Sequence, residues 1–538
     1  MKKFLIRIFP LIFLSTMLDI CHADNITVQG EVSGQWDADT VFVAGDITVS
    51  DGQSLAIQPG TRVIFTGSYF FNVGGSIQAS GSGNDSIWFT IADTAGFIID
   101  TIPDGGWKGI RFDSNRTTNP TSVFYRCNFS FGKNADADPL KGNGGALSVK
   151  AYDKVRVEQC LFTDNFAIYN GGAIALDSSD ISITSSVFKR NRAGLAVAPW
   201  GYGGAVSSDN SNPEIRWNVF TDNSSTGVGG GLSVRYKDCN IYNNVFTENT
   251  SGLGGALCMG HIPETVHRVN NNLLADNYAV YFGGGVATLE ANPVYINNTI
   301  VNNTAMYGGG FYCNDSVSPD FYNTIFWGNQ AGVGPTGYLF EVLSQADFYN
   351  CVVEYGPAAF GGSGGGVTFA GAYENCIELD PEFSFHGDFP FQPDPDSPCI
   401  DAGTADTSGF FLPEYDLANL PRFWGGNIDM GAYELVYEGV KERAYDPNIR
   451  VFPNPYIDHF TIEFDLLKDD KVLIEVFDMG GHCIKSMERN CPTGENLQIT
   501  MDMGGLLFEN EALLLVFSYG KGQFSRKIIH KVTQRSTK

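Results

Sequence analysis

The chain has 538 residues, including 63 glycines, and is long enough for two or three domains. Its formal net charge is −26. Residues 440–538 hold 13 basic and 14 acidic side chains, which leaves 21 basic and 46 acidic side chains for the rest. The acidity therefore belongs to the part before residue 440, which excludes nucleic acid and anionic membranes as partners of that surface. Cations and polar carbohydrate remain open as partners, and the charge can also serve solubility alone.

Residues 1–23 are predicted to be a secretory signal peptide. Three basic side chains precede an apolar run at 9–17, which is too short to span a membrane. Cleavage is expected after Ala23, in the small-x-small pattern Cys-His-Ala. Cys21 raises the alternative of a lipoprotein, but Asp and Ile precede it where small residues are expected. No later segment is predicted to span a membrane.

Residues 24–126 are predicted to form an N-terminal cap and the first coils of a solenoid. Apolar and polar residues alternate from Val41 onward, and Pro59-Gly60 marks a turn. This stretch resembles the opening coils of many bacterial β-helices, in which a similar Pro-Gly phrase and a Trp-x-Gly-Ile phrase recur. A solenoid needs such a cover at its first coil.

Residues 127–377 contain two phrases that alternate about every 25 to 32 residues. One is Gly-Gly followed by Ala or Gly and a large apolar residue, and the other is an apolar pair closed by Asn. This period predicts one coil of short parallel strands per repeat. The glycines are expected at corners, and one residue of each apolar pair is expected inside. The asparagines are expected in left-handed turns, bonded to their own turn, or stacked as an amide ladder.

These phrases resemble the right-handed parallel β-helix of the pectin-lyase-like superfamily and the repeats of polymorphic outer membrane proteins. The second group is marked by GGA followed by Ile, Leu or Val, and by FxxN, as at Gly144, Gly171, Phe162 and Phe188. From Leu273 onward the Phe of FxxN is replaced by Leu or Ile. The resemblance implies an all-β fold, a right-handed parallel β-helix solenoid. It leaves the activity open.

Three acidic residues stand directly before the Asn of successive repeats, namely Asp222, Glu248 and Asp276. Stacked coils would place them about 5 Å apart, where they could hold Ca²⁺ through oxygen ligands or act as catalytic carboxylates. Alternatively, each caps its own turn. His261 lies in an insertion of the following coil and is a further catalytic candidate, although its spacing to the next His matches no zinc motif. No cofactor other than Ca²⁺ is expected.

A second insertion, at residues 193–202, lengthens one repeat, and insertions on one side of a solenoid often form its binding face. Aromatic side chains in and near it are candidates for stacking on sugar rings: Trp200, Tyr202, Trp217 and Tyr236, together with Tyr281 and Tyr307. Packing against the solenoid is the alternative role for these rings.

Residues 378–439 are rich in proline and are predicted to cover the last coil. The phrases SPCIDAG, DLANLPR and NIDMGAYE resemble the choice-of-anchor segment that follows bacterial β-helices. Several charged residues in this segment look catalytic in isolation, but a buried network of salt bridges and turns is the favoured interpretation: Asp401, Asp416, Arg422, Asp429 and Glu434.

Residues 440–446 are predicted to be a charged linker, and 447–538 a small β-sandwich of about seven strands. A disulfide between Cys483 and Cys491 is a further expectation. The phrases VFPNP and VFDMGG resemble the C-terminal sorting domain of the type IX secretion system. The residues that carry this motif are Pro453, Asn454, Pro455, Gly480 and Gly481.

That resemblance implies a Bacteroidetes-type cell, the type IX machinery as a partner, and export across the outer membrane. The protein is then attached to surface lipopolysaccharide or released. Three functions follow as hypotheses. The first is a non-catalytic adhesin or glycan-binding protein that recognises carbohydrate or a host or neighbouring cell surface. The second is a polysaccharide lyase or glycoside hydrolase, and the third is a passive surface stalk.

Overall fold

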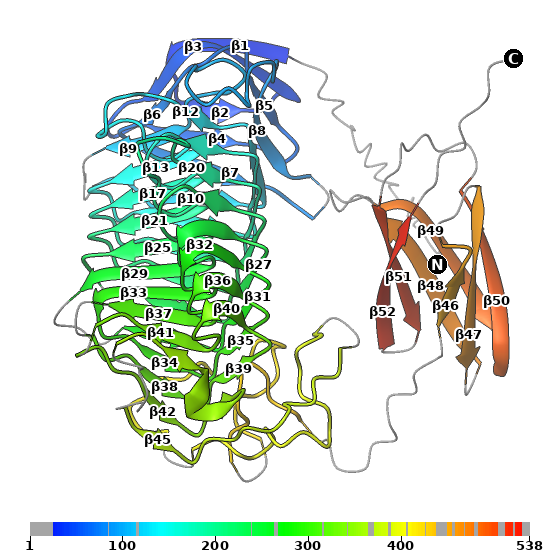
Figure 1. Ribbon diagram of the computed structural model, residues 1–538. Coiled ribbons are helices and arrows are strands. Elements are labelled where there is room, and N and C mark those ends of the chain that lie inside the picture. The colour runs from blue at the N-terminus through cyan, green and yellow to red at the C-terminus, as the bar shows by residue number, and fades with distance from the viewer. Residues whose placement is uncertain are drawn as a thin grey trace, which may run out of the picture. The chain divides into compact units, whose positions relative to one another are not determined.

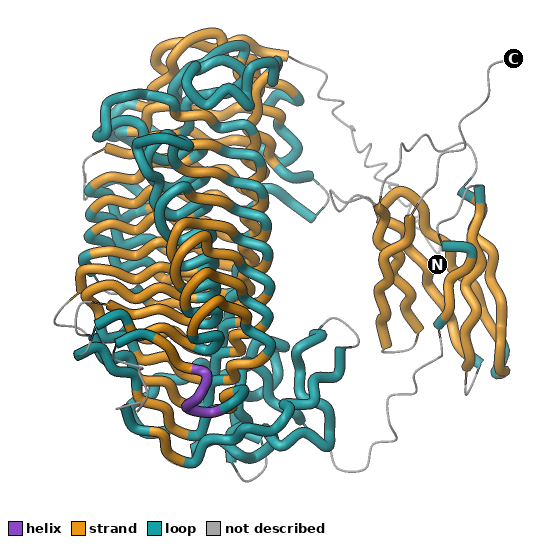
Figure 2. The backbone as a smooth tube through the Cα atoms, viewed as in Figure 1, coloured by secondary structure: helices purple, strands orange, loops and turns teal. Residues whose placement is uncertain are grey.

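The computed structural model describes a solenoid and a small β-sandwich (Figures 1 and 2). It describes residues 25–529 except for 84, 114–117, 238, 263–266, 315–316, 342, 364–370, 386–388, 405–406, 425–426, 437–448, 455–457, 467–468, 478–482, 504–511 and 520–521. The predicted signal peptide with its cleavage site at Ala23, the linker at 440–446, and Pro455, Gly480 and Gly481 lie outside these residues. The chain divides into two compact units: Met1–Asp380, Ala402–Leu417 and Met430–Ala432 form one, and Pro381–Asp401, Ala418–Asp429 and Tyr433–Lys538 form the other.

The first and second faces of the solenoid are parallel ladders that share one long strand, β3 (Thr40–Val49), which also pairs with β1 (Asn25–Glu31). The first face continues through β5 (Arg62–Phe65), β8 (Ile87–Ile91), β11 (Cys127–Ser130), β15 (Leu161–Thr163), β19 (Val187–Lys189), β23 (Val219–Thr221), β27 (Val245–Thr247), β31 (Leu273–Ala275), β35 (Thr299–Val301), β39 (Ile325–Trp327) and β43 (Val352–Val353). The second face continues through β6 (Phe71–Val73), β9 (Ile110–Asp113), β13 (Leu147–Lys150), β17 (Ile174–Asp177), β21 (Val206–Asp209), β25 (Leu232–Arg235), β29 (Leu257–Ile262), β33 (Val286–Ala291), β37 (Phe311–Asn314), β41 (Gly337–Leu339) and β44 (Phe360–Gly361).

The third face is a separate parallel sheet, and a ladder of eight short strands fills the corner between the first and second faces. The third face consists of β2 (Gly34–Trp36), β4 (Ser54–Ile57), β7 (Ser76–Ser80), β10 (Ser122–Tyr125), β14 (Val155–Glu158), β18 (Ser182–Thr184), β22 (Glu214–Arg216), β26 (Asn240–Tyr242), β30 (Arg268–Asn270), β34 (Val294–Ile296), β38 (Asp320–Tyr322), β42 (Asp347–Tyr349) and β45 (Tyr373–Glu374). The corner ladder consists of β12 (Lys133–Asn134), β16 (Phe166–Ala167), β20 (Arg192–Ala193), β24 (Ser224–Ser225), β28 (Thr250–Leu253), β32 (Tyr278–Phe282), β36 (Thr304–Tyr307) and β40 (Gln330–Val333). Each coil thus runs from the third face to the first, through the corner ladder, and onto the second.

The Gly-Gly phrases join the corner ladder to the second face, as the sequence predicts. Gly203 has φ of +66°, and a Cβ there would lie 2.0 Å from the carbonyl oxygen of Val206. The second glycine is equally confined, because a Cβ on Gly172 would lie 2.1 Å from the carbonyl oxygen of Gly204 in the next coil. Neither position accepts a side chain without moving backbone, which explains why the pair repeats.

The apolar pair of each repeat places its phenylalanine inside. The buried rings of Phe129, Phe162, Phe188, Phe220 and Phe246 stack in one column, with neighbouring centroids 4.6 to 4.9 Å apart and planes within 7° of parallel. Each pair is in register across neighbouring coils of the first face. This column forms the centre of the hydrophobic core.

The asparagines that close these pairs form the expected amide ladder. The Nδ2 group of each Asn donates to the Oδ1 atom of the next, at 2.9 to 3.1 Å. The ladder runs through Asn165, Asn191, Asn223, Asn249, Asn277, Asn303 and Asn329. The residue before each Asn, and not the Asn itself, takes the left-handed conformation, as Asp164 does with φ of +54°.

Part of the segment predicted to cover the last coil belongs to the solenoid unit. Within the solenoid unit, residues 402–417 and 430–432 bond to asparagine side chains of coils between Asn243 and Asn350: Asn243 Nδ2 donates to the Tyr415 carbonyl at 3.1 Å, and Asn350 Nδ2 donates to the Ala402 carbonyl at 3.3 Å. The described residues hold one helical segment, the 3-10 helix η1 (Gly356–Ala359). Among them the structure has no helix long and apolar enough to cross a membrane.

The second unit contains a sandwich of two antiparallel sheets, in agreement with the predicted seven strands. One sheet consists of β46 (Arg450–Phe452), β47 (His459–Leu466) and β50 (Gly494–Asp502), and the other of β49 (Cys483–Cys491), β48 (Asp470–Phe477), β51 (Ala512–Tyr519) and β52 (Gly522–Ile529). Cys483 and Cys491 are the two ends of one extended strand, so the predicted disulfide is wrong. The strand cannot bring its own ends within bonding distance.

Candidate ligand-binding groove

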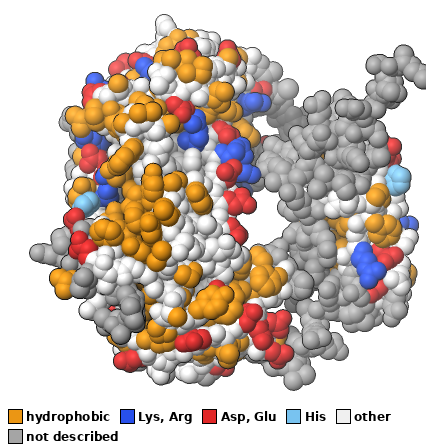
Figure 3. Space-filling model, viewed as in Figure 1, with side chains coloured by type: hydrophobic (Ala, Val, Ile, Leu, Met, Phe, Trp, Pro, Cys, Tyr) orange, Lys and Arg blue, Asp and Glu red, His pale blue; other side chains and the backbone are white. Residues whose placement is uncertain are grey.

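A groove of about 380 Å³ lies on the outside of the solenoid, between the corner ladder and the second face. Its volume falls within the range of small-molecule sites, about 300 to 1,000 Å³. We call it the aromatic groove, and it is lined by Ala196, Trp200, Tyr202, Thr226, Gly227, Val228, Arg235, Gly252, Leu253, Cys258, Gly260, His261, Tyr281 and Leu289. Hydrophobic side chains gather on this side of the solenoid, around β32 and β36 (Figure 3).

The groove exists because small residues occupy one row of the second face. Cys258 and Ala287 are paired in register on β29 and β33, and both are buried. In the next coil the same row holds Tyr312, whose ring packs against Phe282 with centroids 4.5 Å apart. Cys258 lines the groove, whereas Tyr312 two coils later does not.

The insertion at 193–202 supplies the wall on the other side. Gly194 and Trp200 form an antiparallel bridge, and the amide of Leu195 donates to the Pro199 carbonyl at 2.9 Å. The amide of Gly201 then donates to the Thr226 hydroxyl at 3.0 Å. This small hairpin holds Trp200 with 67% of its surface exposed, which leaves the indole ring open for contact.

Tyr281 reaches the groove through an irregularity in the corner ladder. Between Ala279 and Phe282, strand β32 has one residue more than its neighbours β28 and β36, which is a β-bulge. Bulges redirect side chains, and Tyr281 is 54% exposed at the groove. Trp200 and Tyr281 are therefore the two exposed aromatic side chains that line the groove.

An ion pair and a ring contact close the end of the groove nearer the N-terminus. Arg235 donates to both carboxylate oxygens of Asp209, at 2.7 and 2.5 Å, and its guanidinium lies 3.7 Å from the centre of the Tyr202 ring. Burial raises the pKa of Asp209, although the bonds from Arg235 oppose this shift. Burial acts to lower the pKa of Arg235, but the bonds to Asp209 outweigh it and the pKa of Arg235 lies above its ordinary value. The bidentate geometry identifies a charged pair.

His261 lies at the rim with a left-handed backbone conformation that recurs at the equivalent position of neighbouring coils. Its Nδ1 atom is 2.8 Å from a carboxylate oxygen of Glu290, and its ring stacks on Tyr236 with centroids 5.4 Å apart. Tyr236, His261 and Glu290 have φ of +69°, +58° and +51° on successive coils. Four of the predicted residues, Trp200, Tyr202, His261 and Tyr281, therefore line one groove, and Tyr236 contacts it through His261.

The other predicted site residues lie elsewhere. Trp217 occupies a left-handed turn before the first face, in a row that later holds the asparagines contacting residues 402–417 and 430–432. Asp222, Glu248 and Asp276 are exposed, with φ of +55°, +58° and +58°, at the start of the corner ladder, and they do not line the groove. Within the part of the chain that the structure describes, no group of three or more His, Cys, Asp or Glu side chains is placed to hold a metal ion. The calcium site stays a prediction.

Three of the five charged residues predicted to form a buried network, Arg422, Asp429 and Glu434, are buried together within the second unit, whereas Asp416 belongs to the solenoid unit and Asp401 is exposed. Arg422 is fully buried, donates to the Asp429 carbonyl at 2.7 Å, and lies 3.7 Å from a carboxylate oxygen of Glu434. The Asp429 carboxylate accepts from the amide of Asp401 at 2.6 Å. These contacts hold the turns of this segment together.

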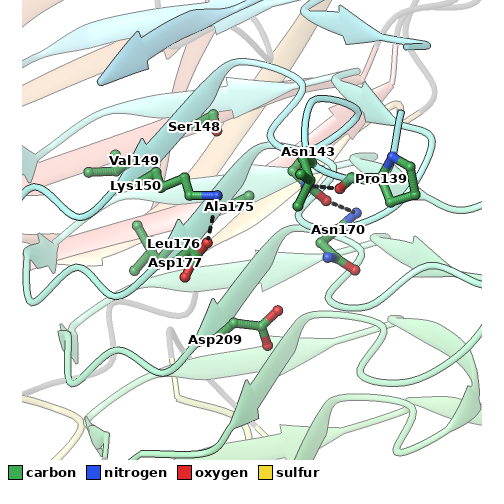
Figure 4. Close-up of a pocket in the computed structure, with 11 residues that line it drawn as sticks. Pro139, Asn143, Ser148, Val149, Lys150, Asn170, Ala175, Leu176, Asp177 and Asp209 are labelled. Atoms are coloured by element: carbon green, nitrogen blue, oxygen red, sulfur yellow. Dashed lines mark hydrogen bonds and ion pairs between the residues drawn. The ribbon is translucent and has the colours of Figure 1, made fainter. Parts of the chain in front are cut away.

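A second, polar pocket of about 190 Å³ lies on the same face, three coils before the groove (Figure 4). Lys150 lies 3.3 Å from Asp177, and the Asn143 side chain donates to the Pro139 carbonyl at 2.8 Å. Asp209 lines this pocket while its partner Arg235 lines the aromatic groove. The ion pair thus separates two pockets on one side of the solenoid.

The sequence could have indicated part of what it missed. The second residue after each Gly-Gly-x phrase falls on the groove row, and it is Cys258, Ala287 and Tyr312 in successive repeats. This change from small to large marks the groove and its end. The thiol in that row is no nucleophile, because burial raises the pKa of Cys258 to about 12.

Comparison with known families agrees with both units. Residues 100–260 match the family model described as right handed beta helix region, and residues 450–507 match the secretion system C-terminal sorting domain. No curated protein matches the chain. The chain is therefore a right-handed parallel β-helix with a type IX sorting domain, which directs it across the outer membrane to the cell surface or the extracellular space.

Proposed function

We propose that the exported protein is a non-catalytic glycan-binding protein, an adhesin, and that the aromatic groove holds a neutral saccharide. The observation that carries the proposal is the pair of exposed rings, Trp200 and Tyr281, at the walls of a groove with an apolar floor. Aromatic rings present a large, rigid apolar surface with a polar tip, which suits sugars because their rings have apolar faces and hydroxylated edges.

The charges around the groove favour a neutral ligand. Arg235 is engaged by Asp209 and His261 by Glu290, so the basic side chains that line the groove are already paired within the protein. A polyanionic ligand would have to displace these carboxylates, and the net charge of −26 opposes its approach. A neutral glycan neither displaces these carboxylates nor is repelled by the net charge.

A glycan array tests the proposal with the full exported chain and two variants. Trp200→Ala is expected to lower binding about tenfold, which corresponds to about 1.4 kcal/mol of lost contact energy. Trp217→Ala removes the same ring from a corner outside the groove and should leave binding unchanged. If no glycan binds, or if both variants bind like the wild type, the adhesin proposal fails.

A polysaccharide lyase or hydrolase is the second candidate, and the His261–Glu290 contact is the observation that favours it. A carboxylate bonded to Nδ1 fixes the tautomer of a histidine and leaves Nε2 available as a base. Incubation with neutral and acidic polysaccharides, with and without Ca²⁺, tests this candidate through unsaturated products or new reducing ends. If the wild type degrades a polysaccharide and His261→Gln does not, the enzyme replaces the non-catalytic proposal. If neither protein degrades any polysaccharide, the enzyme candidate is rejected.

A type IX sorting domain is compatible with either attachment or release of the exported chain, and we infer attachment to surface lipopolysaccharide. The motif residues Pro453 and Asn454 follow strand β46, where the sandwich begins. Cells that express the protein should yield a slowly migrating, lipopolysaccharide-modified form on gels. A single sharp band in the culture medium would identify release instead.

A further inference from the structure

Two pairs of cysteines mark the two ends of an inner row of the solenoid. The middle of the row is a second amide ladder. The backbone amides of Asn218, Asn244 and Asn272 each donate to the side-chain oxygen of the equivalent asparagine in the next coil, at 2.9 to 3.0 Å. Near its C-terminal end, the amide of Thr324 donates to the sulfur of Cys351 at 3.4 Å. The full row is Cys127, Cys160, Ser186, Asn218, Asn244, Asn272, Asn298, Thr324, Cys351 and Cys376.

Cys351 and Cys376 occupy equivalent places in neighbouring coils. The residues that follow them, Val352 and Ile377, form a parallel bridge, and the amide of Ile377 donates to the Cys351 carbonyl at 2.8 Å. Paired positions of neighbouring parallel strands lie about 4.8 Å apart, which falls within the range of about 4.4 to 6.8 Å for the Cα atoms of a disulfide. The backbone therefore already has the spacing that a disulfide needs.

The two thiols also point the same way. Cys351 lies 3.3 Å from the Phe321 carbonyl in the preceding coil, and Cys376 lies 3.6 Å from the equivalent Phe348 carbonyl. Each sulfur also approaches the carbonyl two residues before it, at 3.4 and 3.5 Å. Both thiols are free in the structure.

The pair differs from its counterpart at the other end of the row in access and reactivity. Cys127 and Cys160 are both buried, whereas Cys376 is only partly buried. The hydrogen bond from Cys351 lowers the pKa of Cys376, while burial raises the pKa of both Cys351 and Cys127. Cys376 is therefore the thiol that an external oxidant reaches and the one that ionises more readily.

We propose that Cys351 and Cys376 form a disulfide in the exported protein and that this bond fastens the last coil of the solenoid. Export places the chain in an oxidising compartment, where such bonds form and persist. The last coil needs a fastener because its third-face strand, β45, pairs with a single neighbour, β42, at the end of the sheet. The third-face strands of interior coils are paired on both sides.

The oxidant is a thiol–disulfide oxidoreductase of the export pathway. The Cys376 thiolate attacks the disulfide of that enzyme, forming a mixed disulfide and releasing one enzyme thiolate. The deprotonated Cys351 sulfur then attacks the Cys376 sulfur, forming the bond and releasing the second enzyme thiolate. The pair loses two electrons and two protons, and the enzyme disulfide is reduced to a dithiol.

Thiol counting on the full exported chain tests the bond. The chain is isolated from an oxidising compartment, unfolded with an alkylating reagent in the absence of reductant, and digested. Of the ten cysteines after the signal peptide, we expect Cys351 and Cys376 to escape alkylation and to appear as one linked peptide pair, two hydrogens lighter than the separate peptides. The melting temperature should also fall on reduction.

Two variants keep the test independent of folding defects. Cys376→Ser changes the partly buried partner, and it should free Cys351 for alkylation and remove the effect of reductant on melting. Cys127→Ser changes the buried pair at the other end and should leave the linked peptides in place. Alkylation of both Cys351 and Cys376 in the wild type, or linkage of either one to another cysteine, would overturn the proposal.

Discussion

The interior of the solenoid and the aromatic groove use the same coils in opposite ways. Inside, the same side chain recurs at each level, so that Phe188, Phe220 and Phe246 stack and the asparagines beside them bond in series. In the row that contributes Cys258 to the groove, the side chain changes from coil to coil, to Ala287 and then to Tyr312. Repetition stabilises the stack, and departures from repetition create a place for a ligand.

The largest effect is expected from the phenylalanine column. Phe220→Ala removes a fully buried ring that stacks on both neighbours, and it should lower the free energy of unfolding by about 3 to 5 kcal/mol. Chemical unfolding followed by circular dichroism measures the loss. Val219→Ala, at the partly exposed residue beside it, should cost far less. Equal losses in the two variants would mean that the stacked column is not the source of stability.

The amide ladder should come next. Asn223 donates to the Phe188 carbonyl and to Asn249, both at 2.9 Å, and accepts from the side chain of Asn191. Asn223→Ala leaves these buried groups unpaired, at about 1 to 3 kcal/mol each, so we expect a loss of at least about 2 kcal/mol. Asn210→Ala, an exposed asparagine of another row, is the matched control in the same unfolding experiment. A ladder variant as stable as this control would contradict the account.

Repetition is unfavourable where the repeated side chain is charged, and this gives a smaller, pH-dependent effect. Asp320 and Asp347 are paired in register, and burial together with the Asp347 charge raises the pKa of Asp320 to about 6. A raised carboxyl pKa contributes stability at low pH that is lost as the pH rises through about 6.

Asp320→Asn removes this loss, so it should stabilise the protein at pH 8 and not at pH 4. We expect about 1 kcal/mol at pH 8, because the half-buried carboxyl is partly screened by solvent. Asp222→Asn, an exposed carboxylate of another row, is the control. Melting curves at the two pH values decide the matter, and a gain of equal size at both would show that the carboxyl pKa is not the cause.

The repeated features of the fold could be predicted from the sequence because they depend on contacts between like residues. The FxxN phrases predict both the ring column and the amide ladder, and Gly-Gly predicts the corners. The left-handed residue was misplaced by one position, since Asp164 and not Asn165 takes that conformation. The choice between these neighbours depends on which of them bonds to the next coil.

The groove could be predicted only in part. The insertion pointed to Trp200 and Tyr202, but Trp217 was included because a repeat pattern assigns a residue to a coil and not to one of its corners. The outward position of Tyr281 depends on a bulge that no local signal marks. Leu253 and Leu289 read as ordinary apolar residues, although both line the groove.

The most direct test of the account places a large ring in the groove. Cys258→Tyr introduces into the groove the ring that Tyr312 supplies in the same row two coils later, while Ala175→Tyr adds the same ring to that row at the polar pocket. Calorimetric titration with the glycan that the wild type binds best should show at least about a tenfold loss for Cys258→Tyr alone, with all three proteins folded. Unchanged affinity in a folded Cys258→Tyr protein would contradict the claim that this groove is the binding site.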